Sequence, residues 1–337
     1  MHLRAANPTE YPLLHDLFAR AFKADEAELF DHLIAHDPVC VPEHIRVADV
    51  DGRPVAVTIL LPRRMRSRFG WVDAAVITLV ACEPALQRQG YGGATVRDAL
   101  ECARRQGLAY ALLYGHPTYY PRFGFVPVLP GHAVIVPPAP GAERLAQAAP
   151  ADLPWMTDLY HAHVATTPCA VARTPDPWLW ALRNPSVGGL LTLPDRQGYA
   201  FVGRHKTLDV SEGAAADETA ARRLLDGLRA EAAALGLASV RLIGAPDSQL
   251  ERATANAEGT ESITRPASAG MACILDWEPL LPAGYTVVNE GLAYNGELVF
   301  PAGPTELAQV VLGYRPGPDG FPELFPRWSL APFWHAD

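Results

Sequence analysis

The sequence lacks any regular spacing of cysteines. It has five, and they form neither closely spaced pairs nor a metal-binding pattern with histidine. They are Cys40, Cys82, Cys102, Cys169 and Cys273. We therefore expect no disulfide framework and no metal, and we expect reduced thiols in a cytoplasmic protein.

Basic charge and long apolar runs are also scarce. The 337-residue chain has 28 lysines and arginines against 37 acidic residues, which gives a net charge of −9. Proteins that bind nucleic acid need clustered basic residues to displace counterions from phosphates. No run reaches the ~20 apolar residues that cross a membrane, and Met1–Pro8 contains no apolar signal region. We therefore expect neither a nucleic-acid partner nor membrane association.

The chain does contain enough apolar material for two folded domains. Hydrophobic residues make up 49% of it, and its length exceeds that of a usual single domain. A linker is predicted at 137–141, where proline and glycine repeat and cannot continue a sheet. We expect a first domain over residues 1–137, a linker over 138–146, a second domain over 147–280 and a C-terminal segment over 281–337.

The stretch 77–125 holds the most specific pattern in the chain. It combines a buried strand over 77–82, a glycine-rich turn over 87–93 and a helix over 94–106 with apolar residues at helical spacing. Such a turn leaves several backbone N–H groups at the helix start directed at one spot, where the helix dipole favours negative charge. The stretch therefore predicts a pyrophosphate site.

Spacing excludes two common phosphate loops. A Walker loop needs Lys-Ser/Thr after its glycines, and a dinucleotide fingerprint needs Gly-x-Gly-x-x-Gly. Here the order is Gln87-x-x-Gly90-x-Gly92. This pattern resembles the acyl-CoA signature of the GCN5-related N-acetyltransferase (GNAT) superfamily, Gln/Arg-x-x-Gly-x-Gly/Ala. A strand ending at 79–82 and the segment Tyr-Pro-Arg-Phe-Gly-Phe at 120–125 stand at that superfamily's distances.

The resemblance implies a mixed α/β acyl-CoA N-acyltransferase fold. It also implies an enzyme that moves an acetyl group from acetyl-CoA to a primary amine of a small molecule or peptide. By position, the backbone of Val80, Ala81 and Cys82 would pair with the pantetheine amides of CoA. The Cys82 side chain is expected to be a buried thiol and not a nucleophile, because no basic partner lies nearby in the sequence. The remaining cofactor contacts would be Gln87, Arg88, Gln89, Gly90, Tyr91, Gly92 and Gly93 at the turn, and Gly115 and His116 near the thiol end.

The same resemblance points to Tyr120 as the general acid. It stands four residues before Gly124, at the place that lies beside the CoA sulfur in the superfamily. A phenol is protonated at neutral pH and can donate its proton to the leaving thiolate. The alternative is a packed aromatic side chain, which is what we expect of Tyr119 and Phe123.

The second half of the chain repeats the order of elements without the glycine-rich turn. A long helix is predicted over 218–235, and Glu212, Asp217 and Glu218 before or at its start would repel a pyrophosphate. We therefore expect a degenerate domain of the same kind that binds no CoA. This tandem arrangement is similar to the enhanced-intracellular-survival (Eis) group of aminoglycoside acetyltransferases, although the segment 281–337 is shorter than the corresponding part of those proteins.

The general base is the least constrained role. The attacking amine must lose a proton, but the central strand has no acid over 74–78, and Asp73 lies too far up the strand. Resemblance to the Eis group points to the α-carboxylate of Asp337. The alternatives are a water molecule held by backbone carbonyls, and Glu83.

Two other functions remain open at this point. The chain could be a CoA-binding or sensing module without turnover, or an unrelated phosphate-binding α/β protein. The chain could also associate into a homo-oligomer. The sequence does not identify the acceptor amine.

Overall fold

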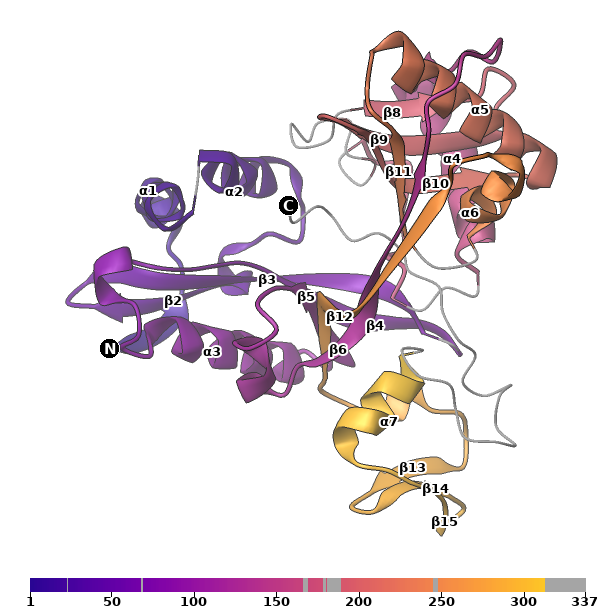
Figure 1. Ribbon diagram of the computed structural model, residues 1–337. Coiled ribbons are helices and arrows are strands. Elements are labelled where there is room, and N and C mark those ends of the chain that lie inside the picture. The colour runs from indigo at the N-terminus through magenta and orange to yellow at the C-terminus, as the bar shows by residue number, and fades with distance from the viewer. Residues whose placement is uncertain are drawn as a thin grey trace. The chain divides into compact units, whose positions relative to one another are not determined.

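The computed structural model describes residues 1–22, 24–67, 69–165, 169–177, 180, 189–244 and 248–312 (Figure 1). They form two compact units. Unit 1 contains Met1–Met65, Phe69–Val128 and Ala269–Val311, and the other described residues belong to unit 2. Strands β6 (Val126–Val136) and β12 (Glu261–Ile274) each begin in one unit and end in the other. Unit 1 is therefore built from three separate stretches of the chain.

Unit 1 is built on a mixed sheet with the strand order β1-β2-β3-β4-β5-β12. Neighbouring strands pair antiparallel at β1–β2, β2–β3 and β5–β12, whereas β4 and β5 are parallel. The predicted Asp-Gly hairpin turn is confirmed, because Asp51 and Gly52 have φ angles of 53° and 79° between β2 and β3. The strands not yet bounded are β1 (His2–Ala5), β2 (Ile45–Val50), β3 (Arg53–Ser67), β4 (Gly70–Cys82) and β5 (Tyr110–Tyr114).

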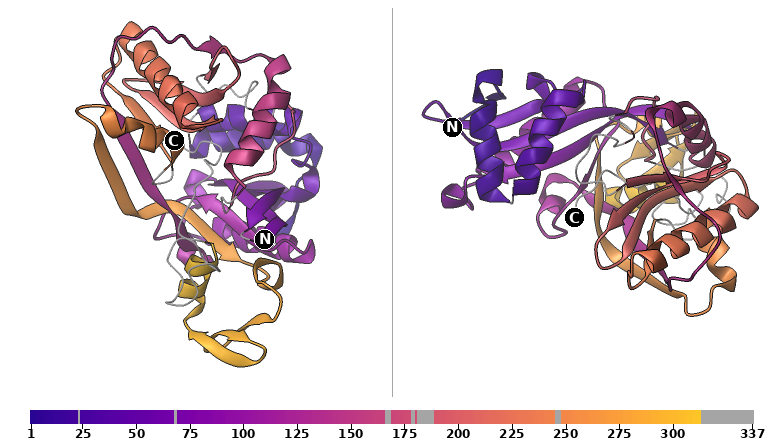
Figure 2. Two further views of the ribbon diagram at one scale, coloured as in Figure 1. Left: turned by 90° about the vertical axis from the view of Figure 1, so that its right-hand side faces the viewer. Right: turned by 90° about the horizontal axis from the view of Figure 1, so that it is seen from above.

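Helices cover both faces of this sheet. Helices α1 (Tyr11–Ala21) and α2 (Ala24–His36) lie on one face, and α3 (Tyr91–Arg105) lies on the other (Figures 1 and 2). The predicted apolar face of α3 is confirmed. Val96, Ala99, Leu100 and Ala103 are buried against β4 and β5 in one core cluster. This core fixes the position of the helix start relative to the end of β4.

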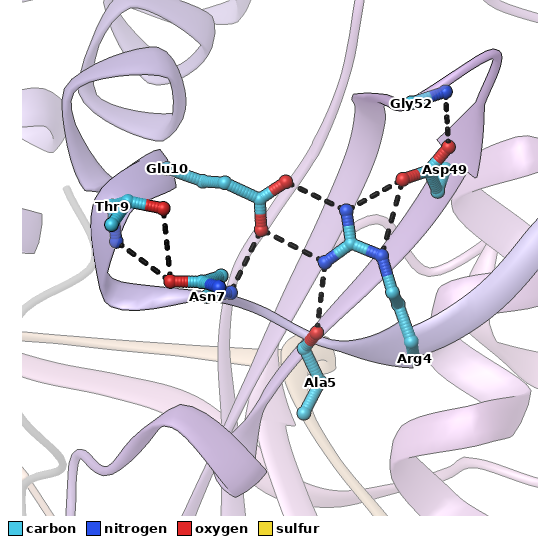
Figure 3. A network of polar contacts seen from close by, with 7 residues as sticks. All are labelled: Arg4, Ala5, Asn7, Thr9, Glu10, Asp49 and Gly52. Atoms are coloured by element: carbon cyan, nitrogen blue, oxygen red, sulfur yellow. Dashed lines mark hydrogen bonds and ion pairs between the residues drawn. The ribbon is translucent and has the colours of Figure 1, made fainter.

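An ion-pair network holds the first strand of unit 1 in place (Figure 3). The guanidinium of Arg4 donates to both carboxylate oxygens of Glu10, at 2.6 and 2.8 Å, and to Asp49 at 2.6 Å. The Glu10 carboxylate also accepts from the backbone N–H of Asn7 at 2.7 Å. The hydrogen bond from Arg4 is the main cause that lowers the pKa of Glu10. The network joins β1 to the end of β2 and to the 3-10 turn that precedes α1.

A small three-stranded sheet follows β12 in unit 1. Its order is β13-β14-β15, and the side chain of Gln309 on α7 donates to the carbonyl of Pro127 at 3.0 Å. This bond links α7 to the beginning of β6. The elements are β13 (Tyr285–Val288), β14 (Gly291–Tyr294), β15 (Glu297–Pro301) and α7 (Pro304–Val311).

The strands of unit 2 have the order β6-β11-β10-β9-β8-β7, and β10 and β11 are parallel whereas the other pairs are antiparallel. Ala200 and Val202 of β9 pack in the core under α5, whereas Tyr199 and Phe201 contact Trp180 on the opposite face. The mixed strand pairings in both units confirm the predicted mixed α/β class, and α5 matches the predicted long helix to within one residue. The elements are β7 (Ala146–Gln147), α4 (Leu153–His163), β8 (Gly189–Thr192), β9 (Gly198–Arg204), β10 (Leu208–Ala215), α5 (Glu218–Ala234), β11 (Val240–Ile243) and α6 (Gln249–Ala253).

A buried ion pair lies on the aromatic face of unit 2. Arg173 donates to both oxygens of Glu212 at 2.7 and 2.8 Å, and the hydroxyl of Tyr199 donates to the same carboxylate at 2.8 Å. The guanidinium stands 4.3 Å from the ring centroid of Tyr160 and 4.8 Å from that of Trp180. The aromatic faces and the two hydrogen bonds to the carboxylate compensate the guanidinium for its removal from water.

Candidate functional site

The site begins where β4 separates from β5. Their parallel register comprises Ala75 with Ala111 and Val76 with Leu112, and within the described strands it goes no further. Strand β4 nevertheless continues to Cys82. Leu79 has a φ angle of 46°, which is uncommon for a residue other than glycine and irregular within a strand. The edge of β4 beyond Val76 is therefore placed to pair with an extended ligand.

The glycine-rich turn connects this strand to α3. Arg88 has a φ angle of 63° and Gly90, the residue before the helix, has one of 93°. Gly90 has no side chain, so no side-chain oxygen caps the helix start. The first intrahelical bond runs from the N–H of Ala94 to the carbonyl of Gly90 at 2.9 Å. The amides of residues 91–93 consequently have no acceptor within the helix, as a bound anion would require.

Three segments converge on the second residue of α3. A Cβ atom placed on Gly92 would lie 3.4 Å from the hydroxyl of Tyr119 and 3.7 Å from the Cβ of Cys82. The end of β4, the glycine-rich turn and the aromatic segment 119–125 are thus neighbours, as the resemblance to the superfamily implies. The side chains of Gln87, Arg88 and Gln89 are exposed beside them.

Cys82 is only half-buried, and its sulfur lies by the amide of Gly92. Burial raises the pKa of the thiol, and the backbone N–H of Gly92 partly opposes that rise. A raised pKa disfavours the thiolate, which is the nucleophilic form. The geometry is consistent with the expectation that Cys82 is not a nucleophile, although the expected full burial is wrong.

Tyr120 lies beneath the backbone of Gly115. A Cβ atom on Gly115 would stand 2.1 Å from Cε2 of the Tyr120 ring, which no side chain could tolerate. The ring also meets that of Phe125 at a centroid distance of 5.8 Å. Burial, with a smaller effect from Tyr119, raises the pKa of the Tyr120 phenol to about 12. The structure therefore gives Gly115 a role that the sequence did not suggest, namely making room for Tyr120.

The neighbouring residues form the turn that carries the tyrosines. The carbonyl of His116 accepts from the N–H groups of Tyr119 and Tyr120 at 3.0 and 3.4 Å, and the His116 side chain is exposed. No described residue accepts a hydrogen bond from the hydroxyl of Tyr120. That hydroxyl is thus available to a bound molecule, while the predicted cofactor contact of His116 stays a prediction.

The acidic residues that could act as the base differ in their surroundings. Both carboxylate oxygens of Glu83 accept from the Arg20 guanidinium, at distances of 2.9 to 3.3 Å, so Glu83 would have to leave Arg20 before it could take a proton. Asp73 is exposed at the other end of β4. Asp337 lies outside the described residues. The structure therefore identifies no base within the described part of the site.

The start of α5 in unit 2 differs from the start of α3. Asp217 caps α5, and its carboxylate accepts from the N–H of Ala220 at 2.8 Å. The protein's own anion thus occupies the helix start. We expected Glu212 to repel a pyrophosphate at this helix start. That role of Glu212 is wrong, because its carboxylate is buried and neutralised by Arg173. The absence of CoA binding in unit 2 remains a prediction, now based on Asp217.

Two further observations concern the described residues as a whole. They contain no group of three or more His, Cys, Asp or Glu side chains that could hold a metal ion. No helix among them is long and apolar enough to cross a membrane.

A known protein family matches the first part of the chain. The family described as an acetyltransferase (GNAT) domain matches residues 2–128. The uncharacterized N-acetyltransferase YjhQ of Escherichia coli strain K12 is 28% identical over 115 residues, which are 34% of this chain and 63% of that protein. The match thus spans less than two thirds of that relative's length.

Solved structures extend the likeness in fold to both units. A GCN5-related N-acetyltransferase from Anabaena variabilis has a TM-score of 0.67 at 16% identity, covering 92% of this chain and 89% of that one. Eis1 from Mycobacterium abscessus has a TM-score of 0.58 at 19% identity, covering 93% and 90%. The predicted acyltransferase fold with a second, similar half is confirmed.

Replacing Gly115 by alanine tests the packing of Tyr120. The added Cβ would overlap the Tyr120 ring, so we expect a loss of about 1 to 3 kcal/mol in the free energy of unfolding, measured by denaturant titration. Gly303→Ala is the matched control, because a Cβ there meets nothing within 4 Å. Equal stability of the two variants would show that Tyr120 is not held beneath Gly115.

Proposed function

We propose, on the premise that residues 2–128 form an acetyltransferase (GNAT) domain, that this chain transfers an acetyl group from acetyl-CoA to a primary amine of a small molecule or peptide. The observation that carries the proposal is the uncapped start of α3 beside the hydroxyl-bearing aromatic segment and the end of β4. An anion site and a proton donor at the end of an open strand edge are what an acyl-CoA enzyme needs.

In this proposal the cofactor lies along β4 and ends at the helix. The backbone of Val80, Ala81 and Cys82 pairs with the pantetheine amides, because the β4–β5 register ends before these residues. The pyrophosphate accepts from the amides at the start of α3. The exposed side chains of Gln87, Arg88 and Gln89 border that position. Catalysis belongs to the predicted first domain, residues 1–137, with no metal taking part.

The chemistry is a direct transfer. The nitrogen lone pair of the amine attacks the thioester carbonyl carbon, a C–N bond forms, and the C–S bond breaks as its electron pair leaves on sulfur. Tyr120 donates its proton to that sulfur, and the proton lost by the amine goes to the base. With the pKa of Tyr120 raised to about 12, the phenol keeps its proton until the thiolate develops beside it.

Replacing Gly92 by glutamate tests the anion site. The carboxylate would stand at the helix start, where we expect it to repel the pyrophosphate and weaken CoA binding by at least about 100-fold in calorimetry. Gly303→Glu makes the same change of charge and size where a Cβ has open space. Retention of full CoA affinity in Gly92→Glu would remove the proposed pyrophosphate position.

Tyr120→Phe tests the acid. We expect kcat to fall by about 100-fold or more with acetyl-CoA affinity nearly unchanged, since only the proton donor is lost. Tyr294→Phe, in the small sheet, is the control. Unchanged turnover in Tyr120→Phe would exclude the acid role, and CoA binding without any turnover in the native protein would instead identify a binding module.

The pH dependence of the native protein gives a second test of Tyr120. Activity should show no loss from ionisation of this phenol up to about pH 10, because its raised pKa keeps it protonated where an ordinary tyrosine begins to ionise.

The proposed base is the α-carboxylate of Asp337, ahead of an ordered water molecule and Glu83. In this proposal the C-terminal segment, 281–337, returns to the acceptor side of the site. Deleting His335–Asp337 should lower kcat at neutral pH by about 100-fold while acetyl-CoA binding persists. Full activity of the shortened chain would eliminate Asp337, and a Glu83→Gln variant would then test the next candidate.

A further inference from the structure

A histidine, a threonine and a glutamate of unit 2 are joined by two hydrogen bonds. The Nδ1 atom of His132, on β6, lies 2.7 Å from the hydroxyl oxygen of Thr264, on β12. The Nε2 atom of the same ring lies 3.1 Å from a carboxylate oxygen of Glu251, on α6. The three residues are far apart in the sequence, and the fold of unit 2 brings them together. The proposed acetyl transfer uses none of them.

The chemistry of these groups sets the direction of both hydrogen bonds when the imidazole is neutral. An ionised carboxylate can only accept, so the ring proton of His132 lies on Nε2 and is donated to Glu251. The Nδ1 atom then carries a lone pair and accepts from the Thr264 hydroxyl. A carboxylate that orients an imidazole, which in turn accepts the proton of a hydroxyl, is the arrangement that activates an oxygen nucleophile.

The three side chains differ in their exposure to solvent. His132 is buried, with 5% of its side chain exposed, and the Glu251 side chain is 22% exposed, whereas Thr264 is exposed. A substrate in solution can therefore reach the hydroxyl, while the imidazole is shielded behind it. The base that such a hydroxyl needs is already within hydrogen-bond distance.

The backbone that carries the carboxylate is also held in place. The N–H of Glu251 donates to the hydroxyl of Ser248 at 3.2 Å, and the Glu251 carbonyl accepts from the hydroxyl of Thr254 at 2.7 Å. These bonds fix Glu251 on both sides of its peptide unit. The orienting group is thus itself positioned by further hydrogen bonds, as a preorganised site requires.

We propose that Thr264, His132 and Glu251 form an acyl-transfer site in unit 2 that takes carboxylic esters as substrates. Thr264 is the nucleophile, His132 is the base, and Glu251 is a positioning residue. An ester carbonyl is the matching electrophile, because attack by a hydroxyl gives a second ester and releases an alcohol. This inference is independent of the proposed function, whose cofactor contacts all belong to unit 1.

The reaction has two steps. The Thr264 hydroxyl gives its proton to Nδ1 of His132 as its oxygen attacks the ester carbonyl carbon. A C–O bond to Thr264 forms, the bond to the alcohol oxygen breaks with its electron pair leaving on that oxygen, and the proton on Nδ1 goes to the departing alcohol. Water then attacks the acyl-threonine and gives a proton to Nδ1, and the Thr264 oxygen leaves and recovers it. One ester and one water molecule become an acid and an alcohol.

A purely structural role of the same bonds makes a different prediction. If they only tie α6 to the two strands, Thr264 should be no more reactive than Ser262. Ser262 lies two residues earlier on the same face of β12, and it is also exposed. It therefore provides a matched hydroxyl for the test.

The test measures p-nitrophenolate release from p-nitrophenyl acetate by the full chain, since release reports attack on the ester whether or not the acyl group accumulates. Thr264→Val, which removes the hydroxyl but keeps the size, should lower the rate at least about 10-fold. Thr264→Ser should retain activity because it keeps the hydroxyl, and Ser262→Ala should release p-nitrophenolate at the native rate.

Variants of the other two residues test their separate roles. His132→Gln removes the base and should also lower the rate at least about 10-fold. Glu251→Gln keeps the size and an acceptor oxygen but loses the charge, and should lower the rate about 10-fold with an unchanged thermal unfolding midpoint. A residue that served stability alone would change the midpoint and not the rate.

Two results would overturn the proposal. Equal rates in Thr264→Val and Ser262→Ala would exclude Thr264 as a nucleophile. An undiminished rate in folded His132→Gln would exclude the base. If His132→Gln does not fold, the exposed Thr264 variants still decide, and either outcome leaves the proposed acetyl transfer in unit 1 untouched.

Discussion

The amides at the start of α3 have no acceptor within the helix, and no side-chain oxygen caps that position. Gly90 enters the helix in a left-handed conformation and provides no capping oxygen. The apolar face of α3 packs on β4 and β5, which holds the helix start at the end of β4. Tyr119 approaches Gly92 from the other side, and Gly115 admits the ring of Tyr120. Together these features bring the uncapped amides, the end of β4 and the tyrosine segment to one place, which we propose as the anion position.

The two units differ in what stands at the start of their long helices, where the helix dipole is positive. In unit 2, Asp217 supplies a carboxylate to the start of α5, so the helix dipole is compensated from within the chain. In unit 1 no described side chain caps the start of α3, and Arg97 and Arg122 stand against the rings of Phe123 and Tyr119 beside it. A helix start that lacks a cap and is bordered by cations is suited to an external anion. The difference between one aspartate and one glycine thus separates a structural helix from a candidate cofactor site.

Local patterns predicted much of the site. Helix α3 and the Asp51–Gly52 hairpin turn follow from spacing and turn chemistry. The placement of the tyrosine segment near the glycine-rich turn followed from the resemblance to the superfamily. Pairings between distant segments did not follow. Residues 270–274 of β12 pair with β5 and so complete unit 1 from late in the chain, and no local pattern specifies such a partner. The contact of Gly115 with Tyr120 and the gathering of Arg97 and Arg122 likewise depend on side-chain directions that exist only in the folded chain.

The central claim concerns backbone amides, and hydrogen–deuterium exchange with mass spectrometry measures them directly. Exchange in a peptide covering residues 87–96 should slow markedly when CoA is added, because the amides at the start of α3 would donate to its pyrophosphate. A peptide covering the start of α5 should be unaffected, since Asp217 already occupies that position. Unchanged exchange over 87–96 at saturating CoA would contradict the account.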